Sequence, residues 1–465
     1  MNQCITNVPS HFTPAASLAG LGVKLQQIKL FESIEQTVHI DQKTIKYSPT
    51  QKLYDSFITL LAGAHGMVEV NTLLRADPTL QAAFGRKACA EQSVVQQTLD
   101  ACTSDNVAQM EEAMNRIYRQ QSCAFQHNYQ QDWQLLDVDL SGWLCGQHAA
   151  FATKGYFADA PRNRRGRQMG RVLASQYQEV VVNRLFAGNR QLGNSVQELV
   201  QAAQSTLQLD DIQRTRCLVR IDAGAGSVSN LNWLLGQGYE ILGKVCSTQQ
   251  ARLLATTVQE WVTDPMCPER EMGWVTEEPT AFLKPVRRVA VRCKKSTGGW
   301  AVGVLVCSLP SAAIVSLAAG LAQEANDHVI LQSLVALYDQ RGGGIETSFA
   351  GDKQGLGITK RNKKRFPAQQ MLMLLGSLAH NVVVWARGWL TSQEDETQAP
   401  TGLRRYGILR MVRDVFRISG SLSFDELGNV VELRLNQDAF LAHLILPSLR
   451  HLLLPMQIAV NLDKI

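Results

Sequence analysis

Acidic residues close two apolar, strand-like segments of this sequence, where they could hold metal ions. In QLLDVDLSG (134–142), Asp137 and Asp139 are two residues apart, so a β-strand would direct both side chains to the same face. Asp222 closes a second such segment, CLVRIDAGAGS (217–227), and runs into a glycine turn. A carboxylate on an apolar strand is costly to bury without a base, backbone amides or a metal as partner. Aspartate also begins many turns, but the repetition of the pattern favours a shared site.

A third, isolated acid follows a run of glycines in YDQRGGGIETSFAGDKQGLG (338–357), at Glu346. Helical segments are expected on both sides of the glycines, although each glycine inside a helix costs about 1 kcal/mol relative to alanine. Three carboxylates from separate elements could hold two divalent cations about 4 Å apart. Such cations activate a water or 3′-hydroxyl and stabilise the leaving oxygen of a phosphodiester. The acids therefore predict two bound Mg²⁺ or Mn²⁺ ions.

Three basic tracts without acids lie within or beside these segments: RNRRGRQMGR (162–171), KPVRRVAVRCKK (284–295) and KRNKKR (360–365). One such tract is usually a solvated face, but three favour a polyanion bound along an extended surface. The tracts predict DNA contacts from Arg164, Arg165, Arg288, Lys363 and Lys364. Three tryptophans near the second tract are expected mainly in the core, although an exposed indole there could stack an unpaired base; they are Trp261, Trp274 and Trp300.

Other classes of protein fit the sequence less well. Gly224 and Gly226 begin a dinucleotide-binding pattern, but Ser229 stands where its third glycine is required. The patterns GxxxxGK[ST], GxSxG and HExxH do not occur, and the nine histidines show no metal-ligand spacing. The composition, with 45% hydrophobic and 19% charged residues and a formal net charge of +5 over 465 residues, is that of an ordinary soluble protein of two to four domains.

The sequence indicates a reducing compartment and no membrane span. Ten cysteines are widely spaced without a CxxC pair, and we expect no signal peptide at the N-terminus. The uncharged segment 301–322 is long enough to cross a bilayer, but Pro310 and three serines divide it. We expect a buried strand followed by a buried helix there. We also expect a helix start at Asp77–Pro78 and a hairpin turn at Leu427–Gly428.

Taken together, these motifs resemble a bacterial insertion-sequence transposase of the DDE type, in the cut-and-paste group with a Tyr, Arg, Glu and Lys signature. The resemblance covers most of the chain: YSPTQKLYDSFITLLAG near the N-terminus, DVDLSG at the first acid, NRLFAGN, and RIDAGAGS at the second acid. Carried over to this sequence, the metal-binding and catalytic triad is Asp139, Asp222 and Glu346. Asp139 is preferred to Asp137 because the family's first acid commonly precedes Ser or Thr, here Ser141.

The signature residues are Tyr338, Arg341, Glu346 and Lys353. Two residues separate Tyr338 from Arg341 and six separate Glu346 from Lys353, as in the family. Four residues rather than three separate Arg341 from Glu346, and one extra residue turns a straight helix by about 100°. We expect the glycines to absorb it by letting the helix break and restart. The resemblance implies that Tyr338, Arg341 and Lys353 contact DNA.

For the fold, the resemblance implies an α/β class: an RNase H-like mixed sheet flanked by helices, with a β-rich insertion and a helical N-terminal domain. The expected parts are a helical DNA-binding domain (1–128), the first part of the catalytic domain (129–246), the β-rich insertion (247–320), the second part of the catalytic domain (321–395) and a C-terminal region (396–465).

For function, the resemblance implies a DNA transposase. It would cleave element ends with Mg²⁺ or Mn²⁺, join the freed 3′-hydroxyl to target DNA, and act on double-stranded DNA as at least a dimer at the bacterial nucleoid in the cytoplasm, without a membrane partner. Two alternatives remain: a related nuclease without strand transfer, and a non-catalytic DNA-binding relic.

Overall fold

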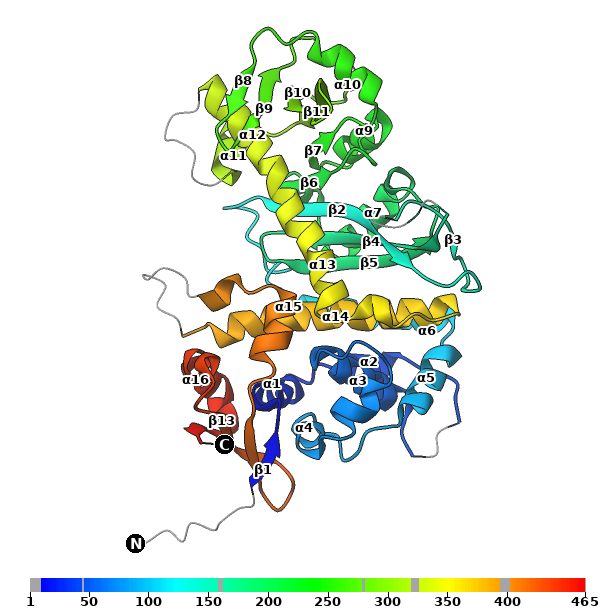
Figure 1. The fold of residues 1–465 in the computed structure, drawn as a ribbon, viewed down its shortest axis with the longest axis vertical. Helices are drawn as coiled ribbons and strands as arrows, with labels where there is room; N and C mark the ends of the chain where they lie inside the picture. The colour runs from blue at the N-terminus through cyan, green and yellow to red at the C-terminus, as the bar shows by residue number, and fades with distance from the viewer. Residues whose placement is uncertain are drawn as a thin grey trace. The chain divides into compact units, whose positions relative to one another are not determined.

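The structure is a computed structural model that describes residues 10–43, 46–157, 161, 163–277, 281–318, 326–393 and 402–464. The chain folds into two compact units, coloured along the sequence in Figure 1. Unit 1 comprises Met1–Gln121, His148–Ala150 and Ser348–Ile465, and unit 2 comprises Ser122–Gln147 and Phe151–Thr347.

Unit 1 is mainly helical. Its elements are β1 (Ser10–Thr13), α1 (Ala16–Gln27), α2 (Glu32–Thr37), α3 (Pro49–Leu61), the π-helix η1 (Val70–Leu74), α4 (Pro78–Ala83), α5 (Gln92–Ala101), α6 (Ser104–Gln121), α13 (Thr347–Gln354, whose first residue belongs to unit 2), η4 (Ile358–Lys360), α14 (Phe366–Leu390), η5 (Gly402–Arg405), α15 (Ile408–Arg410), the π-helix η6 (Met411–Val415), β12 (Gly420–Phe424), β13 (Val430–Asn436), α16 (Phe440–Leu453), η7 (Leu454–Met456) and β14 (Ala459–Asp463).

Local sequence signals account for several helix starts in unit 1. Ser48, which precedes α3, forms a capping box with Gln51 in the first turn, and Pro49 is the first residue of the helix. Asp77 accepts a hydrogen bond from the Leu80 amide at the start of α4, which confirms the predicted helix start. The long apolar helix α14 packs against α3, α5, α6 and α16.

Both ends of unit 1 meet in one small sheet. Its strand order is β1-β12-β13-β14, so residues 10–13 pair with a strand more than 400 residues later in the chain. The predicted hairpin is confirmed: β12 and β13 pair antiparallel, and Gly428 in the turn between them has a φ of +84°. That angle suits glycine, which lacks a Cβ.

Unit 2 is built around one large sheet. Its elements are β2 (Gln134–Leu144), β3 (Thr153–Lys154), β4 (Arg165–Ala174), β5 (Glu179–Ala187), η2 (Leu192–Asn194), α7 (Val196–Leu207), α8 (Asp211–Arg214), β6 (Cys217–Ile221), α9 (Val228–Gly236), β7 (Glu240–Lys244), α10 (Thr248–Ala255), β8 (Val262–Asp264), β9 (Cys267–Trp274), β10 (Arg287–Lys294), β11 (Trp300–Cys307), α11 (Ser311–Leu317), α12 (Asp327–Arg341) and the π-helix η3 (Gly342–Glu346).

The sheet of unit 2 is mixed. Its order is β3-β4-β2-β6-β7-β11-β10-β9-β8, with β5 paired to β4. The central pairs β2–β6 and β6–β7 are parallel, whereas β2–β4 and β7–β11 are antiparallel. The β-rich insertion therefore does not form a sheet of its own, because β11 continues the ladder directly beside β7. The order places β2 and β6, the two strands that lead to the predicted acids, side by side at the centre.

Helices cover both faces of this sheet. On one face, α11 and α12 enclose a core with Leu135 of β2, Leu218 of β6 and Leu305 of β11. On strands β2 and β6, alternation directs the predicted acids to the same face, across which α12 lies (Figure 1). Helices α7, α9 and α10 also pack against the strands. Helix α7 packs on β5, α9 packs on β7 with Leu231 close to Gly243, and α10 packs over β10 and β11.

The predicted fold class is confirmed as a mixed α/β architecture with a mixed sheet flanked by helices. The strand and helix expected within 301–322 are β11 and α11, although residues 319–322 lie outside the described residues. Among the described helices, none combines the length and the apolar character needed to cross a bilayer.

Candidate active site

The predicted acids are positioned by the parallel pairing of β2 with β6. Asp137 lies opposite Arg220 and Val138 lies opposite Ile221 in this register. Asp139 and Asp222 are each the next residue, so they lie side by side where the pairing of β2 with β6 ends. Asp222 follows the last residue of β6, whereas Asp139 lies in the middle of β2, which continues to Leu144 beside β4. Open α/β sheets bind ligands beyond the carboxyl ends of their parallel strands, where Asp222 stands.

The two acids of β2 have different roles in the structure. Asp137 is fully buried and accepts hydrogen bonds from Arg220 Nε at 2.6 Å and Nη2 at 2.9 Å, and a further one from the Ser175 hydroxyl. Arg220 is itself buried and donates from Nη1 to the Leu337 carbonyl of α12 at 2.7 Å. This ion pair therefore ties β2, β6 and α12 together, and its carboxylate is already neutralised.

Asp139 is the more accessible acid, with 17% of its side chain exposed. Its Oδ1 accepts a hydrogen bond from the Leu140 amide at 2.7 Å, and its Oδ2 pairs with Arg341 Nη2 at 2.9 Å. Burial raises the pKa of Asp139 to about 6, the attraction of Arg341 offsets only part of that, and the nearby charge of Asp222 raises the pKa further. The surroundings of Asp139 thus disfavour its ionised form, and such shifted pKa values are common at functional sites.

Asp222 begins the glycine turn after β6. Its carboxylate is half-buried and accepts a hydrogen bond from the Gly224 amide at 2.8 Å. Tyr338 of α12 faces the same acids: burial raises its pKa to about 12, and the charges of Asp222 and Asp139 add to that effect. The sheet and α12 therefore bring together Asp139, Asp222, Tyr338 and Arg341.

Arg341 of α12 is the cation that pairs with Asp139 at this site. It is 4% exposed, and its Nη2 also donates to the Val138 carbonyl at 3.1 Å. Burial lowers its pKa, but the carboxylates of Asp139, Asp137 and Asp222 outweigh burial and raise it, so the side chain stays charged. Its Nε–H is buried, and no described residue accepts a hydrogen bond from it.

The glycine run corrects one prediction, because the helix does not break. After α12 ends at Arg341, residues Gly342–Glu346 form a π-helix, and α13 continues from Thr347. A π-turn bonds each amide five residues back instead of four, so it accommodates one extra residue within a continuous helix. The surplus residue between Arg341 and Glu346 is absorbed in this way.

The glycines serve close packing at one position. A Cβ on Gly344 would stand 3.2 Å from Asp137 Oδ2, whereas a Cβ on Gly343 would have no neighbour among the described residues within 4 Å. Glu346 is exposed, and its carboxylate lies beside Gly342, 3.9 Å from the position of a Cβ there. Lys353 is half-buried in α13 and belongs to unit 1.

The donor atoms suit a hard divalent cation, but the set is incomplete as it stands. Asp139 and Asp222 supply carboxylate oxygens, the ligands that Mg²⁺ and Mn²⁺ prefer. Among the described residues, no three His, Cys, Asp or Glu side chains gather closely enough to hold a metal ion. Glu346 is therefore not brought together with the aspartates into a three-carboxylate centre.

The basic tracts divide into exposed and buried residues. Arg164, Arg165 and Lys364 are exposed. Arg288 is 7% exposed and donates to the Glu277 carbonyl, and Lys363 is 4% exposed and donates to Gln96. Burial lowers the pKa of Lys363 to about 8. Arg162, which begins the first tract, lies outside the described residues.

The three tryptophans are half-buried, so the expectation that they lie mainly in the core holds only in part. Trp274 packs against the core beneath α12, and Trp261 packs against the core beneath α10. The Arg292 guanidinium lies over the rings of Trp261 and Trp300, 4.0 Å and 4.5 Å from their centroids, and pairs with Glu271 at 2.5 Å. The rings therefore already have a cationic partner from the same chain.

Sequence reasoning missed Arg220, although a signal for it was present. Arg220 precedes Asp222 by two residues, as Asp137 precedes Asp139, so each apolar strand carries a charge on the same face as its predicted metal-binding acid. The two inner charges have opposite signs. Opposite charges at matching positions of two buried strands predict an ion pair across them.

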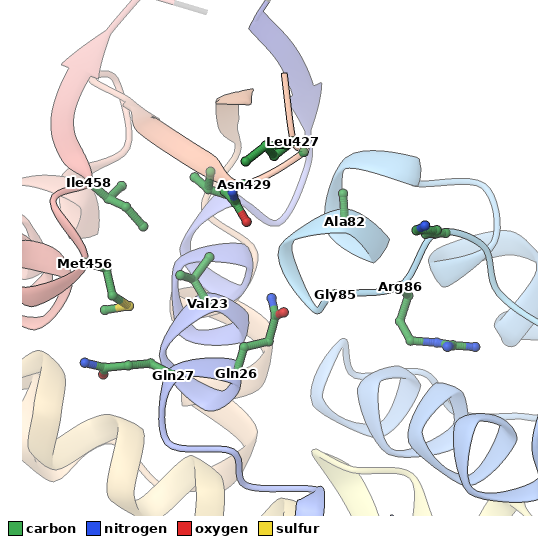
Figure 2. A pocket seen from close by; sticks show the side chains of 13 residues that line it. Val23, Gln26, Gln27, Ala82, Gly85, Arg86, Leu427, Asn429, Met456 and Ile458 are labelled. Atoms are coloured by element: carbon green, nitrogen blue, oxygen red, sulfur yellow. The ribbon is translucent and has the colours of Figure 1, made fainter. Parts of the chain in front are cut away.

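Unit 1 contains a separate cavity of about 660 Å³ between α1, the β12–β13 turn and the segment before β14 (Figure 2). Amide and aliphatic side chains line it, together with Arg86 and Lys87. Arg86 is already paired with Asp55 at 2.8 Å. None of the described residues that line this cavity carries a carboxylate, so it lacks the groups that phosphodiester chemistry requires.

The fold and the acid pair define an α/β protein with a carboxylate site where the pairing of two neighbouring parallel strands ends. Comparison with known families gives this class a name. The family described as transposase DDE domain group 1 matches residues 21–412, and the chain belongs to this family.

Comparisons with solved structures and with curated proteins add little to the family assignment. A cryo-EM structure of the piggyBac transposase synaptic complex with hairpin DNA is similar over 85% of this chain and 80% of that chain, with 14% sequence identity and a TM-score of 0.47. The comparison with curated proteins found no match.

Neutralising Asp137 should lower the free energy of unfolding, whereas neutralising Asp139 should raise it relative to the parent protein as pH rises. Asp137→Asn should lower the free energy of unfolding by about 3–5 kcal/mol, because it leaves Arg220 buried without its counter-charge. Asp139 behaves differently because its pKa is raised in the folded state. Its ionisation reduces stability as pH rises from about 4 through 6, by at most about 3 kcal/mol.

Asp139→Asn should therefore gain stability relative to the parent protein between pH 4.5 and pH 7.5, by on the order of 1–3 kcal/mol. Urea unfolding at both pH values measures this. If the stability of Asp139→Asn relative to the parent protein stays constant or falls over this pH range, the pKa of Asp139 is not raised in the folded protein.

The glycine run offers a matched pair of substitutions. Gly343→Ala should stabilise the protein by about 0.5–1 kcal/mol, because alanine favours the helix and the added methyl group meets none of the described residues. Gly344→Ala should destabilise it by about 1 kcal/mol or more, because Asp137 is held in place and cannot yield to the methyl group. Thermal unfolding of both variants tests this, and equal effects would argue against close packing of the π-turn on Asp137.

Proposed function

We propose that this protein is a DNA transposase that cleaves element ends in a metal-dependent reaction and transfers the freed 3′-hydroxyl to target DNA. The observation that carries the proposal is the convergence of Asp139, Asp222, Tyr338 and Arg341 where the pairing of β2 with β6 ends. Family membership across residues 21–412 supports the same activity. In the proposed reaction, Asp139, Asp222 and Glu346 are the catalytic carboxylates.

Each residue has a definite task in this proposal. The aspartates would hold divalent cations, Mg²⁺ or Mn²⁺, which supply an activated nucleophile and stabilise the leaving oxygen. Arg341 and Tyr338 would orient the phosphate from the α12 side of the sheet, and Lys353 would contact the DNA further along. Glu346 is exposed at the end of the π-turn. It would complete the set of metal ligands when substrate is bound, because a local change in the helical hydrogen bonding of the π-turn would move its carboxylate.

Several finer points belong to the same proposal. We infer two metal ions, at least a dimer on paired ends, an insertion-sequence origin with the Tyr, Arg, Glu and Lys signature, and action at the bacterial nucleoid. The exposed residues Arg164, Arg165 and Lys364 would contact double-stranded DNA, whereas burial leaves Arg288 and Lys363 with internal roles.

One observation favours a second candidate, a DNA-binding relic without catalysis. Among the described residues, Glu346 does not gather with the two aspartates in the free protein. A relic would bind element ends without cutting them, and a nuclease would cut without joining. Incubation with labelled ends, target DNA and Mg²⁺ separates all three, because it scores binding, cutting and joining together.

Loss of one carboxylate should abolish the chemistry and spare DNA binding. Asp222→Asn and Glu346→Gln should each reduce Mg²⁺-dependent cleavage of element ends by at least about 10³-fold, because one ligand for the cation is lost. Binding of the ends, measured by gel shift, should change little. Glu426→Gln, an exposed acid in the β12–β13 turn, is the matched control and should cleave normally.

Cleavage retained by Asp222→Asn would remove the basis of the proposal. Cleavage retained by Glu346→Gln alone would show that the third ligand is another residue, while the pair on β2 and β6 would stand.

Two exposed arginines, Arg164 just before β4 and Arg165 at its first position, should contribute to DNA affinity without sequence preference. Replacing Arg164 and Arg165 together by glutamine should weaken duplex binding and lower the slope of log affinity against log salt by about 2, one for each phosphate that the protein no longer neutralises. Fluorescence anisotropy over a salt series measures the slope. Arg252→Gln, an exposed arginine of α10, is the control. An unchanged slope in the double variant would exclude these phosphate contacts.

A further inference from the structure

Arg341 lies where it competes for the oxygen that a metal ion would need. Its Nη2 is 2.9 Å from Asp139 Oδ2, while Asp139 Oδ1 already accepts the Leu140 amide. A divalent cation on Oδ2 would meet a fixed guanidinium charge at close range in a mostly buried site. Like charges at that distance repel strongly when water is largely excluded.

The other buried cation nearby does not compete in this way. Arg220 is engaged by both oxygens of Asp137 and by the Leu337 carbonyl. Arg341 has looser contacts, because it holds one oxygen of Asp139 and the Val138 carbonyl through the same Nη2. Its Nε–H is buried without a partner among the described residues, which costs free energy that a better acceptor would recover.

We propose that Arg341 holds the metal-binding oxygen of Asp139 in the free protein and exchanges it for a DNA phosphate when substrate binds. The inference rests on the proposed function, since it assigns the acid pair to a divalent cation. A phosphate offers two oxygens to the guanidinium fork and can accept from Nε as well as Nη2. The π-turn that follows Arg341 directly is an element in which the helix can change its register locally.

This exchange makes metal and DNA assist each other. DNA removes the guanidinium from Asp139 and thereby strengthens metal binding, and linkage requires that metal strengthens DNA binding by the same factor. The free protein is then poorly loaded with metal, and the complete site forms on the substrate.

The test measures Mn²⁺ affinity by electron paramagnetic resonance, first with Mn²⁺ alone. Arg341→Gln should bind Mn²⁺ about 10-fold more tightly than the parent protein, because a competing charge has been removed. Arg341→Lys should fall between them, since a single ammonium cannot reproduce the guanidinium contacts. Arg270→Gln is the matched control; it removes a cation that pairs with Asp339 of α12 at 2.5 Å and should leave the affinity unchanged.

A second measurement adds a short mixed-sequence DNA duplex. The duplex should tighten Mn²⁺ binding in the parent protein and have a much smaller effect in Arg341→Gln. Equal tightening in both proteins would overturn the proposal, and so would unchanged or weaker Mn²⁺ binding by Arg341→Gln without DNA. If Arg341→Gln does not fold, as judged by circular dichroism, Arg341→Lys decides by the same criteria.

Failure of the exchange can be told apart from failure of the proposed function. Asp222→Asn reports on the metal site alone and should weaken Mn²⁺ binding whether or not Arg341 competes. If Asp222→Asn leaves Mn²⁺ binding unchanged, the acid pair is not the metal site and both inferences fall. If it weakens binding while Arg341→Gln does not tighten it, only the exchange is refuted.

Discussion

The ion pair between Asp137 and Arg220 is the interaction on which the site depends. It joins the two central parallel strands at matching positions, and the remaining hydrogen bond of Arg220 reaches the backbone of α12. A slip of one residue between β2 and β6 would place a lone charge in the core, so the pair specifies the register as well as filling the interior. Everything beyond it, including Asp139, Asp222 and the start of the π-turn, takes its position from that register.

This arrangement lets one strand carry two acids with different duties. The inner acid is fully compensated and holds the framework, while the outer acid is left partly desolvated beside a loosely held partner. Proteins commonly give up stability at the place where they act. Here the loss of stability is confined to Asp139, because Asp137, two residues away, accepts hydrogen bonds from three separate donors.

Much of the framework was readable from local pattern. Alternation along QLLDVDLSG and CLVRIDAGAGS predicted both strands, and turn chemistry predicted the β12–β13 hairpin. The prediction that an acid closes each strand is correct for Asp222 and wrong for Asp139, because pairing with β4 extends β2 to Leu144. Long-range features were not readable: nothing in residues 10–13 indicates pairing with β12, because that contact depends on how the whole of unit 1 closes.

Two errors had physical causes that the sequence did contain. Arg167 and Arg171 stand on alternate positions of a buried strand, so a basic tract read as surface was half interior. The spacing mismatch before Glu346 is visible in the sequence, but a shift in hydrogen bonding inside a helix leaves no sequence signal beyond that mismatch. Among the described residues, Glu346 stands apart from the two aspartates, a separation that no local pattern encodes.

The continuity of the large sheet has a consequence for how the insertion can behave. Because β11 is bonded to β7, and Met272, Val289 and Leu305 share a core with Leu135 and Leu218, the insertion and the acid-bearing strands belong to one cooperative block. The insertion is then a stiff extension of the platform beneath α12 and cannot swing as an independent arm. A load applied at its far edge would be transmitted along the hydrogen-bonded ladder towards β6 and β2.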